Sequence, residues 1–199
     1  MANGHYFETE PRVTSRLHDV ELALPGETLS LCADRGVFSS ARVDPGTLTL
    51  LRSVGDPPGR GHLLDLGCGY GPIAVSIARR SPAATVWALD VNRRALELTA
   101  ANARRHSCAN VRPVTADDVP PDVRFAEIWS NPPIRIGKPA LHDLLARWLG
   151  RLETGGRAWL VVQRHLGSDS LADWMTSQGY GVRRVASKAG YRVLEVAAP

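Results

Sequence analysis

The sequence predicts a doubly wound α/β fold: a mostly parallel seven-stranded sheet with an antiparallel end strand, preceded by an N-terminal β-hairpin extension. From residue 61 onward, short apolar runs of strand type alternate with runs of helix type, as in the repeating units of a parallel sheet. The last two apolar runs have no helix between them, which favours an antiparallel pair at one end of the sheet. Gly and Pro clusters separate the runs and mark short loops.

The composition indicates one domain. A chain of 199 residues with 44% hydrophobic content can bury one substantial core. We expect residues 1–43 to form an extension with the hairpin and residues 44–199 to form the catalytic core. The sequence shows neither a signal peptide nor a membrane-spanning run, which predicts a cytoplasmic protein with no membrane partner. Its net charge of +4 is compatible with an anionic partner.

The N-terminal elements have clear boundaries in the sequence. Two partly alternating runs, at 17–24 and 28–33, flank Pro25 and Gly26, a pattern that predicts the hairpin. Asp44 and Pro45 then predict a helix start, because a carboxylate suits the N-cap and proline suits the first helical position.

The core elements follow in regular order. The apolar runs predict strands at 62–67, 85–90, 110–116, 125–130, 157–163, 181–187 and 191–197, and helices at 71–80, 92–106, 140–152 and 170–178. Ligands of such sheets bind beyond the carboxyl ends of the strands. The candidate site residues therefore follow the strands.

The run DLGCGYGP, at 65–72, places three glycines where a strand should pass into a helix. A dinucleotide loop needs its third glycine at position 72, where this chain has proline, and the Asp65 carboxylate would repel a pyrophosphate. S-adenosylmethionine has an ammonium and a sulfonium and no phosphate, so the same carboxylate favours it. We therefore expect Asp65, Gly67, Cys68 and Gly69 to bind this cofactor, with Cys68 as a small side chain beneath it and not as a nucleophile.

Acidic residues follow the next two strands. Asp90 can accept both ribose hydroxyls, with Val91 beside it, although Asp90 could instead cap the helix that begins near Asn92. Asp117 is a candidate acceptor for the adenine amino group, and a solvated loop is an equal alternative. Asn131, after a later strand, is a further candidate contact of the cofactor.

The run NPPI places Asn131, Pro132 and Pro133 at the end of a strand. The prolines hold this segment extended, so that the Asn131 side-chain oxygen and the Pro132 carbonyl could accept the two hydrogens of a planar amine. These bonds would direct the amine lone pair toward the sulfonium methyl, and positioning would supply most of the catalysis. The alternative is a rigid turn with no chemical role.

The chain resembles the class I methyltransferases of the small-domain type, a Rossmann-like family that includes ribosomal RNA guanine amine methyltransferases. The resemblance is carried by HYF at 5–7, GVFSSARVDPGTLTLL at 36–51, LLDLGCGYGPIAVSIA at 63–78, ALDVNRRALELTAANA at 88–103, SNPPIRIGK at 130–138 and KAGYRVLEV at 188–196. It implies that Asp65, Gly67 and Gly69 hold the methionine end of the cofactor and Asp90 its ribose. It also implies that Asn131 to Pro133 hold the amine, and that Phe38 and Ser39 lie near the mouth of the site.

The chain departs from this family in two respects. Many relatives have an aromatic residue after NPP that stacks on the target base, whereas this chain has Ile134; Phe38 is a candidate replacement. The larger ribosomal RNA enzymes of this type contain a second, degenerate copy of the domain. We therefore expect RNA recognition to come from this domain's own surface or from a dimer, unless the substrate differs.

The sequence thus predicts methylation of an exocyclic base amine, most directly guanine in ribosomal RNA, by a monomer or homodimer. Arg135 and Lys138 would contact phosphates, or form a solvated basic loop. The alternative substrates are a protein glutamine amide and a small-molecule amine, and a non-catalytic module that keeps the fold is a third possibility. The histidines and cysteines show no metal-ligand spacing, so we expect no metal.

Overall fold

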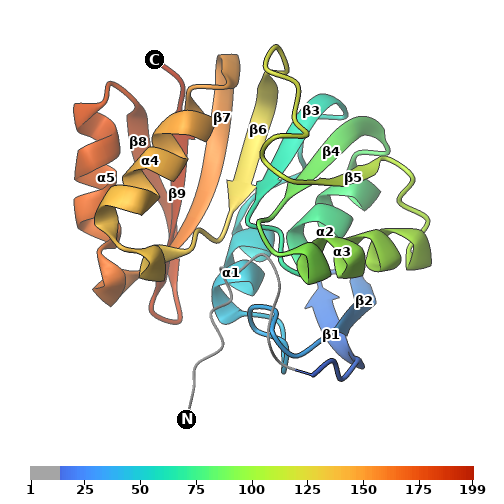
Figure 1. Cartoon of the computed structure of the whole chain (residues 1–199). Coiled ribbons are helices and arrows are strands. Elements are labelled where there is room, and N and C mark those ends of the chain that lie inside the picture. Colours follow the sequence, from blue (N-terminus) through green and yellow to red (C-terminus); the bar gives the residue numbers. More distant parts are fainter. Residues whose placement is uncertain (1–13) are drawn as a thin grey trace.

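The computed structural model describes residues 14–199, and the HYF run at 5–7 lies outside them. The elements are β1 (His18–Leu24), β2 (Glu27–Ala33), α1 (Pro45–Ser53), β3 (Arg60–Leu66), α2 (Pro72–Arg80), β4 (Ala83–Leu89), α3 (Arg93–Arg105), β5 (Val111–Val114), β6 (Phe125–Ser130), η1 (Ile134–Ile136), α4 (Lys138–Leu149), β7 (Leu152–Gln163), η2 (Arg164–Leu166), α5 (Ser168–Ser177), β8 (Gly181–Lys188) and β9 (Tyr191–Ala197). β1 and β2 form a separate hairpin, and the other strands form one sheet in the order β5-β4-β3-β6-β7-β9-β8 (Figure 1).

The sheet confirms the predicted topology. Strands β5, β4, β3, β6 and β7 are parallel, and β9 runs antiparallel to both β7 and β8. The chain progresses from β3 outward through β4 to β5 and then returns to β6 on the other side of β3. This reversal opens a crevice at the carboxyl ends of β3 and β6, where ligands of doubly wound sheets bind.

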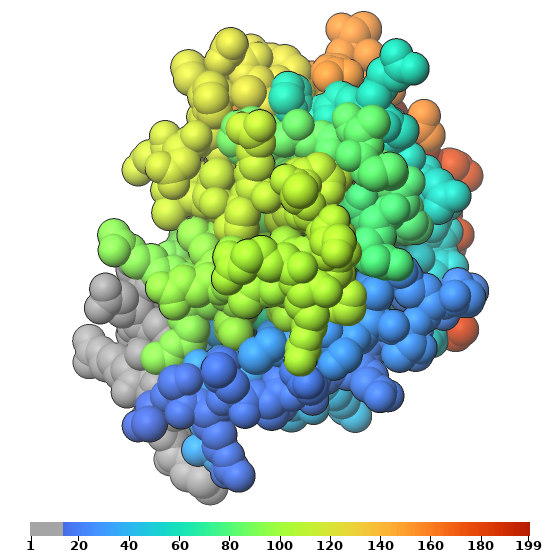
Figure 2. Space-filling view, turned by 90° about the vertical axis from the view of Figure 1, so that its right-hand side faces the viewer, coloured from blue at the N-terminus to red at the C-terminus, as the bar shows by residue number. Residues whose placement is uncertain are grey.

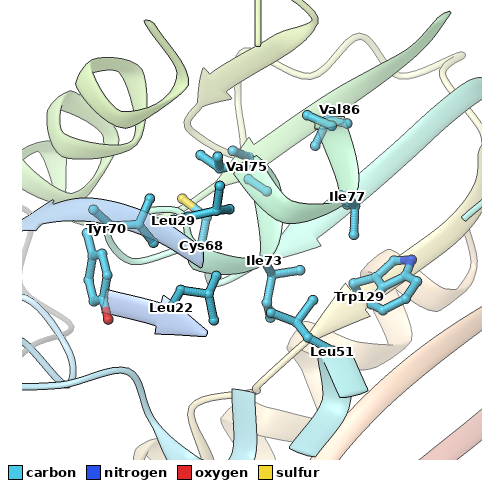
Figure 3. Packing of buried hydrophobic residues seen from close by; sticks show 14 of the residues in the cluster. Leu22, Leu29, Leu51, Cys68, Tyr70, Ile73, Val75, Ile77, Val86 and Trp129 are labelled. Carbon is cyan, nitrogen blue, oxygen red and sulfur yellow. The ribbon is translucent and has the colours of Figure 1, made fainter. Parts of the chain in front are cut away.

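Helices cover both faces of the sheet. The hairpin, α1, α2 and α3 contribute to one apolar core, and α4 and α5 contribute to the other. Leu63 and Leu64 of β3 belong to different cores, because successive side chains of a strand point to opposite faces. Figure 3 shows Leu22 of the hairpin and Leu51 of α1 lying close to Ile73 of α2 in the first core.

The beginning of α1 is as predicted. Asp44 is its N-cap, and the Oδ1 atom accepts hydrogen bonds from the backbone N–H groups of Gly46 (2.8 Å) and Thr47 (3.1 Å). This cap places the Asp44 carboxylate at the carboxyl edge of the sheet.

The hairpin packs on α3, as Figure 2 shows for the blue and green segments. The connecting side chain is Asn102, which is fully buried. Its Oδ1 accepts from Cys32 N (2.7 Å), and its Nδ2 donates to Cys32 O (2.9 Å) and Tyr70 O (2.7 Å). One amide therefore links the hairpin to the glycine loop, and the chain after β2 is held against this loop.

Strand β7 is longer than predicted, since it begins at Leu152 and not at residue 157. The added segment contains Gly155 with φ of 75° and an irregular register opposite β6. A Cβ atom at Gly156 would lie 3.0 Å from the Phe125 carbonyl oxygen. It would also lie 2.9 Å from the Glu153 carbonyl oxygen of the same strand, so the two glycines allow both a tight local bend within β7 and its close approach to β6.

Candidate active site

A cavity of about 490 Å³ lies at the carboxyl ends of β3, β4, β6 and β7. Among the described residues, the exposed large apolar side chains are Leu17, Phe38, Val91 and Leu166, and all but Leu17 line this cavity. Exposed apolar groups gathered around a concavity mark a ligand site. The cavity brings together the following predicted site residues: Phe38, Ser39, Gly67, Gly69, Asp90, Val91, Asn131, Pro132, Pro133, Ile134 and Arg135.

Asp90 connects the end of β4 to the glycine loop. Its Oδ2 accepts from Gly69 N (2.9 Å) and its Oδ1 accepts from Asn92 N (2.9 Å), while burial raises the pKa of the carboxyl. The N-cap of α3 is Asn92, whose side chain accepts from Ala95 N (3.3 Å). Capping therefore does not account for Asp90, which faces the cavity.

Asp65 lies beneath the glycine loop and does not line the cavity. It is fully buried, and its Oδ2 accepts from Ala74 N (2.8 Å) in α2. Its Oδ1 is buried without a hydrogen-bond partner among the described residues. Burial, together with the nearby Asp90 charge, raises the pKa of Asp65 from 3.8 to about 8.

Cys68 packs against α3. Its Sγ lies 3.6 Å from Thr99 Oγ1, and a Cβ atom at Gly71 would lie 2.9 Å from the same hydroxyl oxygen, which explains why glycine is required there. Burial raises the pKa of the Cys68 thiol well above its ordinary value, so the neutral thiol predominates. Such a thiol is a poor nucleophile.

Asn131 is held by the first turn of α1. Its Nδ2 group donates to Asp44 Oδ1 (2.8 Å) and to Thr47 Oγ1 (3.1 Å). A carboxylate only accepts hydrogen bonds, so this contact determines which end of the amide is the nitrogen. The carbonyl oxygen of Asn131 is consequently left available to a ligand in the cavity.

The two prolines form a tight turn. Pro133 has φ of −75° and ψ of 73°, and the Pro132 carbonyl accepts a hydrogen bond from Ile134 N (2.8 Å). These are the features of an inverse γ-turn. The Pro132 carbonyl therefore has one lone pair left for a ligand.

Besides Asp65 and Cys68, two further predicted residues lie outside the cavity lining. Asp117 follows β5 in an exposed loop, and Lys138 is exposed at the start of α4. The remaining basic candidate, Arg135, is exposed and does line the cavity.

Sequence reasoning missed Gln163, Leu166 and Tyr191, which all line the cavity, and assigned Asp44 only to a helix cap. Gln163 ends β7 and could have been found by the rule that placed Asp90. Tyr191 begins β9, and an antiparallel strand brings its amino end to the edge where parallel strands have their carboxyl ends.

Within residues 14–199, no group of three or more His, Cys, Asp or Glu residues could hold a metal ion. None of the helices described has the length and apolar composition that crossing a bilayer requires.

Several known proteins are similar to this chain. It is 34% identical over 194 residues to the uncharacterized protein YbxB of Bacillus subtilis, covering 96% of both chains. It is 31% identical to ribosomal RNA small subunit methyltransferase C of Shewanella amazonensis, covering 82% of this chain and 49% of that one. The T. thermophilus 16S rRNA N2 methyltransferase RsmC, solved with AdoMet and guanosine, has the same fold, with a TM-score of 0.80 and 23% identity over 95% of this chain and 52% of that chain.

The chain spans about half the length of the ribosomal RNA methyltransferases that it matches. The sequence model of the methyltransferase small domain family matches residues 28–195, which include the glycine loop, Asp90 and the NPP turn. The chain therefore belongs to the methyltransferase small domain family.

Proposed function

We propose that the chain transfers the methyl group of S-adenosylmethionine to an exocyclic base amine, namely that of guanine in ribosomal RNA. The observation that carries this proposal is the orientation of Asn131. Its Nδ2 group is bonded to Asp44 and Thr47, so its carbonyl oxygen can accept a hydrogen from an amine in the cavity. The similarity to ribosomal RNA small subunit methyltransferase C supports RNA as the source of that amine.

The residues around the glycine loop fit the cofactor. The buried Asp65 Oδ1 atom has no partner among the described residues, and a cationic ligand above the loop would favour the ionised form of this carboxyl group. Asp90 and Val91 line the cavity after β4 and would hold the ribose side. When bound, S-adenosylmethionine supplies a methyl group on a positively charged sulfur.

The protein's part in the reaction is to orient the acceptor. An exocyclic amine conjugated with its ring is planar, and its lone pair lies perpendicular to the plane of its hydrogens. If Asn131 Oδ1 and the remaining lone pair of Pro132 O accept those hydrogens, the nitrogen lone pair is held in one direction. Such positioning lowers the barrier to methyl transfer without a general base. The sulfur would keep the electron pair of the broken S–C bond, and the methylated nitrogen would release one proton to solvent.

The mouth of the cavity suits an anionic polymer. Arg135 lines the cavity, and Arg42, Arg93 and Arg164 are exposed close in sequence to the lining residues Ser39, Asn92 and Gln163. Guanidinium groups pair with phosphates, and these contacts weaken as salt displaces them.

Label transfer tests the proposal. The protein is incubated with methyl-labelled cofactor and with ribosomal subunits, intact or stripped of protein, and the labelled nucleotide is identified by mass mapping. We expect label on guanine, which Asn131→Ala abolishes while the cofactor dissociation constant stays within a few fold of wild type. Label in protein glutamine or in a small molecule, with none in RNA, would refute the RNA proposal. Full transfer by the Asn131 variant would refute the amine contact.

A further inference from the structure

The wall of the cavity next to Asn131 is formed by the end of β7. Val161 and Gln163 both line the cavity, whereas Val162 between them packs into the core beneath α4 and α5. The alternation of strand side chains therefore directs Gln163 to the ligand side. Across the antiparallel ladder, Gln163 is paired with Tyr191, which also lines the cavity.

The side-chain amide of Gln163 has hydrogen-bonding capacity that the rest of residues 14–199 does not use. Gln163 precedes η2 at the capping position, yet its side chain makes no capping hydrogen bond. The cavity lining is largely apolar, and it includes Val161, Leu166 and the ring of Tyr191. A polar amide in such a wall is costly when a ligand covers it without bonding to it.

Gln163 and Asn131 can reach the same ligand. Ser130 of β6 is paired with Leu160 of β7, so Asn131 is level with Val161. Gln163 lies two residues beyond Val161, which is about 7 Å along β7, and β7 lies one strand spacing of about 5 Å from β6. A planar heterocycle whose amine meets Asn131 would therefore present a neighbouring edge to Gln163.

We propose that Gln163 recognises the ring edge next to the acceptor amine and selects bases that have a ring N–H followed by a carbonyl oxygen, as guanine does. The Oε1 atom of Gln163 accepts from the ring N–H, and its Nε2 group donates to the carbonyl. Adenine and cytosine have an acceptor nitrogen beside their amine, so the amide can make only one of the two bonds. A glutamine substrate also offers only its carbonyl. This inference rests on the proposed function.

The chain offers a matched control, because its two glutamines are Gln163 and Gln178. Gln178 is exposed after α5 and outside the cavity lining. With glutamine side chains labelled by ¹⁵N, the full chain shows two side-chain amides, and Gln178→Met identifies which is which. Guanosine and 2-aminopurine riboside are titrated in the presence of S-adenosylhomocysteine. Both probes have the 2-amino group, but 2-aminopurine has neither the ring N–H nor the carbonyl.

We expect guanosine to shift the Gln163 amide signals and to leave those of Gln178 in place. Gln163→Met should weaken guanosine binding about 10- to 100-fold, the effect of leaving a polar edge unpaired, and change 2-aminopurine riboside binding by less than about threefold. Equal weakening of both probes, or of neither, would overturn the role of Gln163 while leaving guanine as substrate. If wild type binds no purine nucleoside but transfers label to a glutamine peptide, both this inference and the proposed function fail.

Discussion

Asn131→Asp tests the contact that orients the acceptor amine. The substitution keeps the shape of the side chain and replaces the nitrogen that donates to Asp44 by a carboxylate oxygen. Two carboxylate oxygens would then lie where the structure has a 2.8 Å hydrogen bond. The expected result is a loss of stability that depends on pH.

The size of the effect follows from that distance. Two unit charges 2.8 Å apart near a protein surface, at an effective dielectric constant of about 20, repel by about 6 kcal/mol. The pair can instead bind one proton, which costs about 1.4 kcal/mol for each pH unit above the ordinary carboxyl pKa near 4. We therefore expect the variant to lose about 5 kcal/mol at pH 8 and only about 1 kcal/mol at pH 5.

Urea unfolding of wild type and variant at both pH values measures this difference. The double variant Asp44→Asn with Asn131→Asp restores one donor and one carboxylate, and it should recover stability at pH 8 to within about 1 kcal/mol of wild type. Equal stability of Asn131→Asp at pH 5 and pH 8, or no recovery in the double variant, would show that Asp44 does not hold Asn131.

Three further predictions follow from the same region. Asp90→Ala removes the acceptor of the Gly69 N–H, and calorimetry should show the cofactor binding about 10- to 100-fold more weakly; unchanged affinity would exclude Asp90 from the cofactor site. The raised pKa of Asp65, about 8, means that the free folded chain keeps a proton that the unfolded chain releases above pH 4. The contribution of this proton to the free energy of unfolding is therefore complete below pH 4. It is lost as the pH rises to 8, by about 1.4 kcal/mol per pH unit. Asp65→Asn should remove this slope from the variant, so the difference in free energy of unfolding between wild type and variant should change by about 1.4 kcal/mol per pH unit between pH 4 and pH 8; a difference that does not depend on pH would contradict the burial argument. Gly46→Ala would place a Cβ 2.7 Å from Tyr191 Cε1, so we expect a loss of about 1–3 kcal/mol and a higher KM for the acceptor; wild-type values for both would show that the Tyr191 ring moves freely.

The sequence by itself determined the order and type of the core elements and the residues that follow the ends of the strands. Apolar periodicity is local, and the rule that ligands bind at the carboxyl edge then brought Gly69, Asp90 and Asn131 to one place. The start of β7 was predicted at residue 157, because a local pattern could not show that Leu152 already pairs with Phe125 of β6.

Only the tertiary structure decided how the site residues are held. Asn131 bonds to Asp44, which lies 87 residues earlier in the chain, and Tyr191 reaches the cavity through the antiparallel placement of β9. The sequence also placed the Asp65 carboxylate at the loop entrance, whereas burial beneath α2 changes its protonation state. Contacts between distant segments and the desolvation of a charge depend on how the layers pack, and neither leaves a periodic signal in the chain.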